Sequence, residues 1–408
     1  MHVVDFTGKR LKSFKPHMAS IVDIVMDPLG EFIGTASIDG ARRVNVHSSS
    51  AHTRLGQVVI HSLNTPESYS FDYKRPMRTL ALEPNFSKRG TRSFVCGGLA
   101  GNLILHDKGW LGHKETILHN GEGPVWQVRW RGTLIAWAND LVSERRWYTR
   151  PDLTPLHQGI KIYDTASSSR ITFIDRPADA PRADLFKCNM HWQDDSTLLI
   201  GWADQIKVAR IRARPRTTTS SASANTPPLL VEITAVFQLD CMVAGIIPHH
   251  SGQELLSLTS FLIIAYTPPD TSFYNEATED RAQQAKKVAE RPELRIISRA
   301  GEELSADALG ISGFQSWGCN DYALAEIEPD GATGRRYVVL SPQDIVVVKP
   351  RDRKDHIEWL VDHQRYEEAL EELEKLGDLR GGDTNASEIG QKYVEHLVGQ
   401  GGLIAILG

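Results

Sequence analysis

Apolar and polar residues alternate along most of this chain, and one alternating segment occurs twice. Residues 134–139 read Leu-Ile-Ala-Trp-Ala-Asn, and residues 199–204 read Leu-Ile-Gly-Trp-Ala-Asp, about 65 residues later. Each copy follows an apolar-alternating run and a polar turn, so each predicts the second strand of a β-hairpin. A third matching strand, 160–162 and then 206–208, repeats at an offset of about 46 residues. The first copy therefore carries roughly 19 extra residues, about 140–158.

The same comparison works one unit earlier. Residues 38–40 align with 99–101, and 58–61 align with 103–106, so the offset drops from about 61 to about 45 residues. Some 16 residues, about 41–56, are extra at the same place in the hairpin. A period near 45 residues of short strands is typical of the four-stranded blades of a WD-repeat-like β-propeller, and no helical repeat of that length fits such strict alternation.

The strand pattern predicts a mainly β fold, a β-propeller of about seven blades over residues 1–350. Two strands around a turn at 7–9 form an incomplete first blade that lacks its inner strands. A propeller closes by pairing strands from both ends of the chain, and this start does not predict how the ring closes. The later groups begin near Ile21, Met77, Pro124, Leu185, Met242 and Tyr322.

The pattern changes to a helical one after Lys349. One predicted helix carries apolar residues at helical spacing, namely Tyr366, Ala369, Leu370, Leu373 and Leu376. A second is predicted over 386–398, beyond a glycine-containing break at 380–382. Residues 351–408 thus predict the first helices of an α-solenoid. A solenoid needs three or more repeats to bury its apolar faces, so we expect this sequence to end inside a larger architecture.

Composition and charge exclude several classes of protein. Apolar residues make up 41% and charged residues 24%, as in ordinary folded domains, and the net charge of −5 predicts no nucleic-acid surface. No apolar run approaches the roughly 18 residues of a membrane span, and no signal-peptide core is found. The cysteines lie on different blades without a close pair, which favours reduced thiols in the cytosol over disulfides or metal knuckles: Cys96, Cys188, Cys241 and Cys319.

Two irregular stretches are predicted to be flexible loops that belong to the blades. Residues 210–228 have a basic half and a half rich in Ser, Thr and Ala, a composition that cannot bury apolar area. Its chemistry suits acidic lipid or phosphorylation, but a solvated loop is the simpler interpretation. Residues 268–292 include a charged, helix-like segment at 276–291 with too few large apolar side chains for membrane insertion.

No set of residues predicts a catalytic, cofactor-binding or metal site. Several polar or glycine-rich positions are better explained by turns than by chemistry: His249, His250 and Ser251; Glu122 between two glycines; Asp194 and Asp195; and Gly97, Gly98 and Gly101. The acidic pair has no partner at metal-ligand spacing, and the glycines lack the helix and Lys-Ser/Thr opening of a phosphate-binding loop. An enzyme would need convergent acid-base or metal-binding groups, so we predict a protein that is not an enzyme.

The tryptophans allow two interpretations. Five of them alternate inward and are predicted to fill the blade core rather than to form a recognition cage: Trp126, Trp130, Trp137, Trp192 and Trp202. Trp110 follows a polar Lys-Gly turn and is the better candidate for a surface position.

Several segments resemble the vacuolar protein sorting-associated protein 41 family. The similarity runs, with gaps, from about residue 3 to residue 398 and includes the propeller, the junction and the first helices. The matching segments are Ile-Leu-His-Asn-Gly-Glu-Gly at 117–123, Val-Arg-Trp-Arg-Gly at 128–132 with 134–139, Ser-Pro-Gln-Asp-Ile-Val-Val at 341–347, and the junction 352–370 with Asp-His-Ile-x-Trp-Leu and Tyr-Glu-Glu-Ala-Leu. The resemblance implies a subunit of the HOPS tethering complex, which acts before membrane fusion at the vacuole or lysosome.

The same resemblance implies the partners and the location. These are other HOPS subunits, a Rab- or Arf-like small GTPase and the vacuolar-route adaptor complex, with peripheral membrane association on the cytosolic face of vacuole, lysosome and late endosome. The alternative is a propeller-solenoid subunit of a vesicle coat, against which the junction motif argues. The sequence assigns no partner-binding residue to either face of the propeller.

The sequence also departs from this family. Family members generally lack the segments 41–56 and 140–158, usually have residues ahead of Val3, and continue after Val398 into a long solenoid with a zinc-binding RING. The two extra segments are either loops on one face of the propeller, where partner contacts are common, or translated intron sequence. We favour the second interpretation, because it also accounts for the unusual start and end.

Overall fold

The computed structural model describes most of the chain in two compact units. One unit comprises Met1–Ala325 with Val339–Val346, and the other comprises Glu326–Val338 with Val347–Gly408. The described residues are 1–5, 8–37, 57–88, 90–109, 112–140, 159–177, 180–215, 227–249, 260–270, 281–327, 335–349, 353–362, 364–377 and 383–399.

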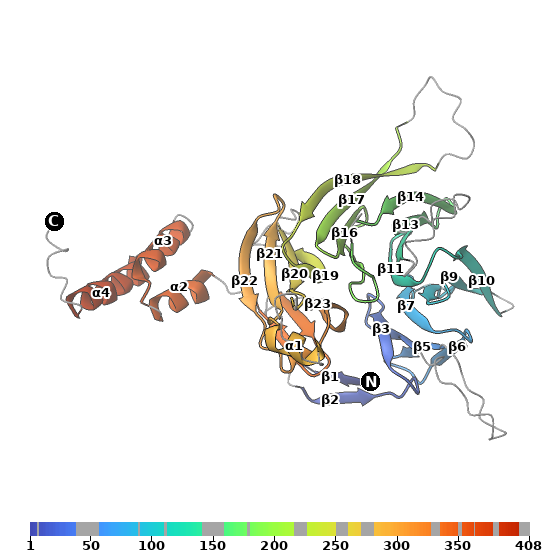
Figure 1. Cartoon of the computed structure of the whole chain (residues 1–408), viewed down its shortest axis with the longest axis horizontal. Coiled ribbons are helices and arrows are strands. Elements are labelled where there is room, and N and C mark those ends of the chain that lie inside the picture. The colour runs from blue at the N-terminus through green and yellow to red at the C-terminus, as the bar shows by residue number, and fades with distance from the viewer. Residues whose placement is uncertain are drawn as a thin grey trace. The chain divides into compact units, whose positions relative to one another are not determined.

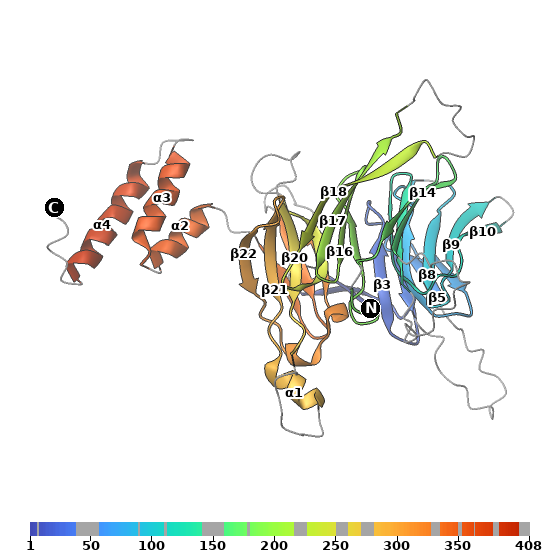
Figure 2. The ribbon, with the colours of Figure 1, turned by 45° about the horizontal axis from the view of Figure 1, so that its top comes forward.

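Five four-stranded antiparallel sheets follow one another along the first unit as propeller blades, side by side around a common axis (Figures 1 and 2). The first blade is β3 (Ile21–Met26), β4 (Phe32–Ser37), β5 (Gln57–Ser62) and β6 (Ser68–Asp72), and the second is β7 (Met77–Leu82), β8 (Phe94–Gly98), β9 (Leu103–Gly109) and β10 (Gly112–His119). The third is β11 (Val125–Arg131), β12 (Leu134–Asn139), β13 (Gly159–Asp164) and β14 (Ser169–Asp175), and the fourth is β15 (Asn189–Trp192), β16 (Thr197–Trp202), β17 (Gln205–Ala213) and β18 (Leu229–Gln238). The fifth is β19 (Met242–His249), β20 (Ser260–Tyr266), β21 (Glu293–Ser298) and β22 (Glu303–Ala308).

The predicted count of about seven blades is wrong, because the described residues form six. The sixth sheet has three strands, β23 (Ala323–Ile327), β24 (Arg336–Leu340) and β25 (Ile345–Val348). The two N-terminal strands, β1 (His2–Val4) and β2 (Arg10–Ser13), form a separate two-stranded sheet and do not add to a blade. Alternation predicts that a segment is a strand, but it does not say which strands pair, and the count of seven failed at that step.

The strand register confirms the sequence comparison between the first and second blades. It corrects the comparison between the third and fourth blades by two residues. Val58 pairs with Ala36 and Leu103 pairs with Gly97 at the same place in the first and second blades, as the offset of 45 predicted. In the third and fourth blades, however, Trp137 lies opposite Val128 while Ile200 lies opposite Met190. The structural offset is therefore 63 residues rather than 65. A slip of two residues keeps every side chain on the same face, so the pattern alone could not detect it.

Polar side chains on the innermost strands join consecutive blades. Four of them stand at equivalent positions, since Asp23, Thr79, Gln127 and Asn189 lie opposite Ala36, Gly97, Ala138 and Gly201 on the second strands. Each forms a hydrogen bond to the backbone of the next blade: Asp23 accepts from Leu80 N at 3.0 Å, Thr79 Oγ1 from Val128 N at 3.0 Å and Gln127 Oε1 from Met190 N, while Asn189 Nδ2 donates to Val243 O at 2.9 Å. These bonds fix the register between neighbouring blades.

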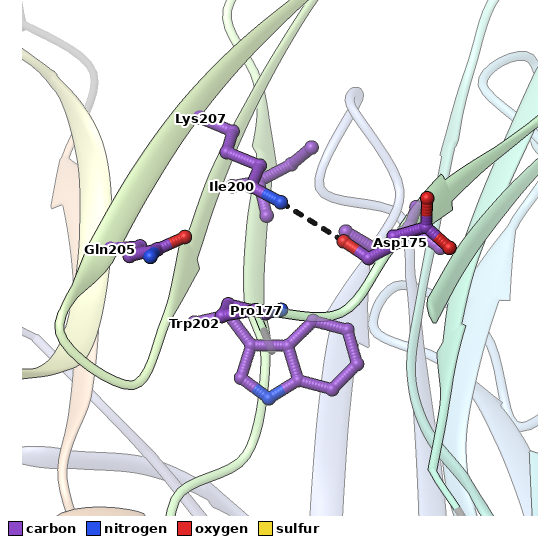
Figure 3. Close-up of a pocket in the computed structure, with 7 residues that line it drawn as sticks. Asp175, Pro177, Ile200, Trp202, Gln205 and Lys207 are labelled. Carbon is purple, nitrogen blue, oxygen red and sulfur yellow. Dashed lines mark hydrogen bonds between the residues drawn. The ribbon is translucent and has the colours of Figure 1, made fainter. Parts of the chain in front are cut away.

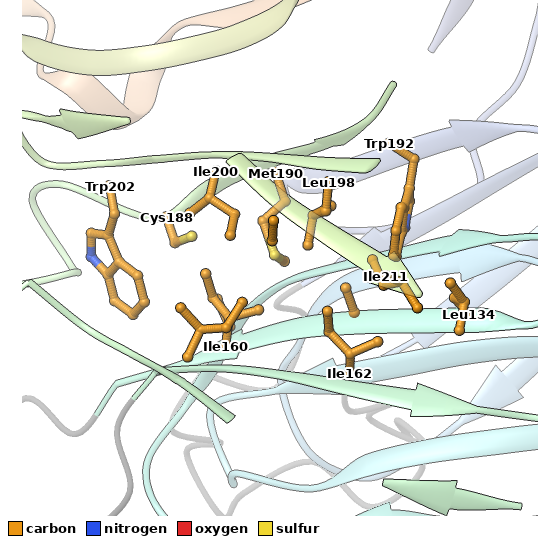
Figure 4. Close-up of a cluster of buried hydrophobic side chains, with 14 of the residues drawn as sticks. Leu134, Ile160, Ile162, Cys188, Met190, Trp192, Leu198, Ile200, Trp202 and Ile211 are labelled. Atoms are coloured by element: carbon orange, nitrogen blue, oxygen red, sulfur yellow. The ribbon is translucent and has the colours of Figure 1, made fainter. Parts of the chain in front are cut away.

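Apolar side chains fill the space between the blades. The largest cluster lies between the third and fourth blades, where Trp192 and Trp202 enclose aliphatic side chains such as Ile160 (Figure 4). Trp126, Trp137, Trp192 and Trp202 are buried, which confirms the core prediction for these four, whereas Trp130 is half-buried. Trp110 lies outside the described residues.

The predicted loops and extra segments lie largely outside the described residues. Of the segments 41–56 and 140–158, only Asp140 is described. Part of the predicted 210–228 loop is strand, because β17 continues to Ala213, which pairs with Leu229 on β18. Ile211, two residues before Ala213, is buried. Within 268–292 the charged segment forms α1 (Arg281–Val288), as its pattern predicted. Further along the chain, after the fifth blade, two 3-10 turns lie at Phe314–Ser316 and Cys319–Asp321.

Three helices make up the described end of the second unit: α2 (Arg353–Asp362), α3 (Tyr366–Gly377) and α4 (Asp383–Gly399). Their apolar faces meet in a small core of Ile357, Leu360, Ala369, Leu373 and Ile389. The rings of Tyr366 on α3 and Tyr393 on α4 lie at an angle of 32° to each other, with their centres 5.7 Å apart. The predicted helical spacing is thus confirmed, but a solenoid is not evident from three helices.

Candidate functional site

A group of polar side chains lies where the second blade connects to the third. It comprises His119, Glu122, Asn139 and Lys161, and we call it the Lys161 cluster. Three successive residues in the left-handed region, Gly121 (φ 84°), Glu122 (φ 58°) and Gly123 (φ 89°), form the turn that connects β10 to β11. The two glycines adopt this conformation without a Cβ penalty, and their turn directs Glu122 towards β12 and β13.

Lys161 is the centre of this cluster. Its side chain is 1% exposed, and Nζ donates to a carboxylate oxygen of Glu122 and, at 2.7 Å, to Asn139 Oδ1. The amide of Asn139 in turn donates to the backbone oxygen of Glu122 at 2.6 Å. The ring of Phe173 lies 5.3 Å from the ammonium group, a distance at which a cation–π contact is favourable. The cluster therefore ties the 119–124 connection to the two middle strands of the blade.

The pKa values in the cluster favour a fixed ion pair. Burial lowers the pKa of Lys161, and the hydrogen bond that Lys161 donates to Glu122 opposes this shift. Burial alone would raise the pKa of Glu122, but the hydrogen bond and charge of Lys161 outweigh it and hold this pKa below its ordinary value. Burial, followed by the charge of Lys161, lowers the pKa of His119 to about 4. At neutral pH the site thus holds a charged Lys–Glu pair beside a neutral imidazole.

This arrangement suits structural support rather than acid-base catalysis. A general base needs a pKa near the working pH and a reachable proton, whereas Glu122 is already bonded to the ammonium of Lys161. Sequence reasoning had assigned Glu122 to a tight turn, and the backbone confirms that turn. It missed Lys161, because a lysine inside an alternating strand normally faces water. The glycine on each side of Glu122 was the available signal.

A second feature is an open cavity of about 340 Å³ at the turn end of the innermost strands. Polar and apolar surface contribute about equally to its walls, and the polar part includes an exposed ion pair of 2.7 Å between Arg131 and Asp195. The remaining lining comes from Met26, Pro28, Leu82, Pro84, Trp130 and Gly132. The residues that line it include no nucleophile and no acid-base pair.

A smaller pocket lies between the third and fourth blades (Figure 3). Trp202, Pro177 and Ile200 form its apolar side, and Lys207 Nζ donates to the backbone oxygen of Asp175 at 3.0 Å. The lysine thus bridges two blades, and this bridge accounts for its place in the pocket.

The turn residues considered from the sequence do not converge on one site. His249 is buried, with Nδ1 2.8 Å from Ser260 Oγ, and both His250 and Ser251 lie outside the described residues. Asp194 accepts from Ser196 N at 2.7 Å, as expected in a hairpin turn. The glycines serve close packing and turns: a Cβ on Gly98 would lie 2.1 Å from Pro76 O, while Gly97 packs against Val125 and Gly101 has φ 78°.

The cysteines and other ligand-type residues form no metal or redox site in the described part of the chain. All four cysteines are buried and none is in a disulfide. Burial raises the pKa of each thiol, to about 12 for Cys96, Cys241 and Cys319. Among the residues whose placement is described, no three His, Cys, Asp or Glu side chains gather as metal ligands, and no helix is long and apolar enough to cross a membrane.

Comparison with known proteins identifies the family. The family model for the Vps41 β-propeller, described as a Vps42 beta-propeller, matches residues 1–350. The vacuolar protein sorting-associated protein 41 homologs of Solanum lycopersicum and Arabidopsis thaliana are each 36% identical, over 416 and 410 residues, and the Homo sapiens homolog is 30% identical over 405. These alignments include 98% of this chain but only 37–40% of the relatives, so the chain spans about two fifths of their length. The chain belongs to the vacuolar protein sorting-associated protein 41 family.

Proposed function

We propose that this chain is part of a HOPS tethering subunit that acts in protein transport to the vacuole and in fusion at the vacuole, lysosome and late endosome. The observation that carries the proposal is similarity over 98% of the chain to relatives named for vacuolar protein sorting.

The propeller is proposed to act as a protein-interaction platform without enzymatic activity. Its blades are joined by buried apolar clusters and by hydrogen bonds between innermost strands, so its loops are held on a rigid support. Binding loops on such a scaffold are a common arrangement. In this proposal residues 1–350 are the propeller, and 351–408 are the first helices of a solenoid that leads to the rest of the complex.

The proposed partners are other HOPS subunits, a Rab- or Arf-like small GTPase and the vacuolar-route adaptor complex. Association with the cytosolic face of vacuole, lysosome and late endosome membranes would then occur through these partners. A coat or other trafficking assembly is the second candidate, because a propeller followed by helices also suits such a subunit.

Affinity purification with the tagged 408-residue chain tests the proposal. The expected result is recovery of HOPS core subunits from a cell lysate, together with recovery of the purified vacuolar Rab in its GTP form and not in its GDP form. Recovery of coat subunits without any HOPS core subunit would favour the second candidate, and recovery of neither group would reject both.

Two variants separate the roles of the helices and the propeller. Leu373→Asp places a charge in the helical core, where Leu373 is 8% exposed, and should abolish core-subunit recovery while leaving GTP-dependent Rab recovery intact. Val394→Asp is the matched control, because Val394 is 47% exposed on α4 and should tolerate the charge. Equal recovery of core subunits with both variants would contradict a role for these helices.

A further inference from the structure

Three positively charged side chains gather where the second, third and fourth blades begin. Arg78 lies on β7, Arg129 on β11, and Lys187 two residues before β15. Asp23 on β3 lies 4.0 Å from Arg129. Burial lowers the pKa of Lys187, Asp23 opposes this shift, and the charges of Arg129 and Arg78 add to it. The charge of Lys187 is therefore within range of the other three. We call Arg78, Arg129 and Lys187 the innermost cation group.

Neutral groups hold two of these cations in place. The guanidinium carbon of Arg78 lies 4.2 Å from the ring centre of Trp126, a favourable cation–π distance. Lys187 Nζ donates to the backbone oxygen of Asn320 at 3.3 Å, and Lys187 N donates to Asn320 Oδ1 at 2.8 Å. Among the described residues, neither Arg78 nor Lys187 has a carboxylate oxygen within 4.0 Å, and the guanidinium of Arg78 forms no hydrogen bond. Both side chains are half-buried, so a small ion can reach them.

The charges around the innermost cation group do not balance. Burial lowers the pKa of Arg78, and the charge of Asp184 opposes this shift. Asp184 is already paired, because its two oxygens accept from Arg182 Nε at 3.0 Å and from Arg182 Nη2 at 2.6 Å. Asp23 remains as the carboxylate that faces the group. With Arg182 and Asp184 counted as one neutral pair, three positive charges face one negative charge, and two positive charges are left over.

We propose that the innermost cation group binds a phosphate group, either as the free ion or as part of a small phosphomonoester. A phosphate ester carries about −1.5 to −2 charges at pH 7, which matches the surplus, whereas a carboxylate carries only one. Arginine donates to phosphate oxygens in a planar fork, and lysine adds a point charge. The bound group would thus accept the hydrogen bonds that Arg78 does not make within the described residues. This site goes beyond the proposed tethering function and does not depend on it.

Calorimetric titration of the purified 408-residue chain with inorganic phosphate tests the proposal. Sodium chloride keeps the ionic strength constant, so that general screening does not change during the titration. Phosphate should bind saturably, and acetate, with its single charge, should bind at least about tenfold more weakly. Glycerol 2-phosphate is titrated in the same way, and the tighter of the two phosphates identifies the form that the site prefers.

Two variants locate the binding site. Arg78→Gln should raise the Kd for phosphate at least about tenfold, because it removes a charge and its charge-assisted hydrogen bonds. Arg92→Gln is the matched control. Arg92 also lies over an aromatic ring, 4.8 Å from the centre of Phe32, but its charge is already paired with Glu67 at 3.1 Å. Its variant should bind phosphate as the native chain does.

Acetylation of the native chain keeps the proposal testable if Arg78→Gln fails to fold. Acetic anhydride reacts with the neutral amine, and a bound phosphate would both cover Lys187 and raise its pKa. Phosphate should therefore slow the acetylation of Lys187, followed by mass spectrometry, but not that of the exposed Lys114 on β10. Absence of saturable binding, equal binding of acetate, the same Kd for the Arg78 and Arg92 variants, or equal protection of both lysines would each overturn the proposal.

Discussion

In the Lys161 cluster, the structure predicts that losing Glu122 lowers the free energy of unfolding more than losing Lys161 does. Glu122→Gln removes the negative charge and keeps the side-chain shape and the left-handed turn. Lys161→Met removes the positive charge and keeps the volume. The side chain of Lys161 is 1% exposed, whereas that of Glu122 is 27% exposed, so only the carboxylate can regain water when its partner is lost.

The magnitudes follow from this difference in exposure. Breaking a buried ion pair by removing one partner costs about 3–5 kcal/mol, and Glu122→Gln should fall in this range because it leaves a buried ammonium. The cost of Glu122→Gln cannot exceed about 5 kcal/mol, because Lys161 can lose its proton instead. For a lysine with an ordinary pKa of 10.5, deprotonation at pH 7 costs about that much. Lys161→Met should cost about 1–3 kcal/mol, chiefly because the buried Asn139 Oδ1 loses its donor.

Denaturant unfolding of both single variants and of the double variant measures these costs. We expect Glu122→Gln to lower the midpoint more than Lys161→Met, and the double variant to be close to Lys161→Met alone, because the two changes share one interaction. Glu115→Gln is the control: its side chain is 59% exposed on β10, so it should cost under about 1 kcal/mol. A Glu122→Gln variant as stable as Glu115→Gln, or less destabilised than Lys161→Met, would refute the reasoning.

Three further predictions concern packing and pH. Gln127→Ala should lower the free energy of unfolding by about 1–3 kcal/mol, because it orphans a buried N–H of the next blade, whereas Gln205→Ala at an exposed amide pair should cost under about 0.5 kcal/mol in the same denaturant titration. Gly98→Ala should sharply reduce soluble yield and melting temperature, because its Cβ would overlap a backbone oxygen, while Gly90→Ala, with no atom within 4 Å, should leave both unchanged. Burial lowers the pKa of His119 from 6.5 to about 4, so between these pH values the folded state binds fewer protons than the unfolded state. The free energy of unfolding should therefore fall by about 1.4 kcal/mol per pH unit as the pH drops from 6.5 to about 4. His119→Gln should remove that part of the slope in unfolding curves recorded between these pH values.

The Lys161 cluster shows where sequence reasoning reached its limit. Two glycines around Glu122 predicted the turn correctly, because glycine favours left-handed backbone and leaves a recognisable spacing. The partner of Glu122 is 39 residues away along the chain, and its burial depends on how β13 pairs with β12 and on where the preceding connection passes. A single sequence carries no record of that contact, so Lys161 had the pattern of an ordinary strand lysine.

The inter-blade hydrogen bonds show the same limit. Asp23, Thr79, Gln127 and Asn189 share no residue type, so no motif marks their common position. They become equivalent only when the strands pair and each innermost strand meets the next. The exposure of Ile24 on β3 was invisible for the same reason, since Ile24 and Leu80, the buried residue at the same position of the second blade, are both apolar.

The sequence by itself determined the strands, the blade period, the helical character of the C-terminal region and the family. These depend on local alternation and on residues a few positions apart, which remain readable along the chain. Only the tertiary structure decided the number of blades, the two-residue shift between Trp137 and Trp202, the burial of Lys161 and the exposure of Ile24 on β3. Each of these depends on which distant strand or blade covers a given face, because alternation assigns a side chain to a face without saying what packs against it.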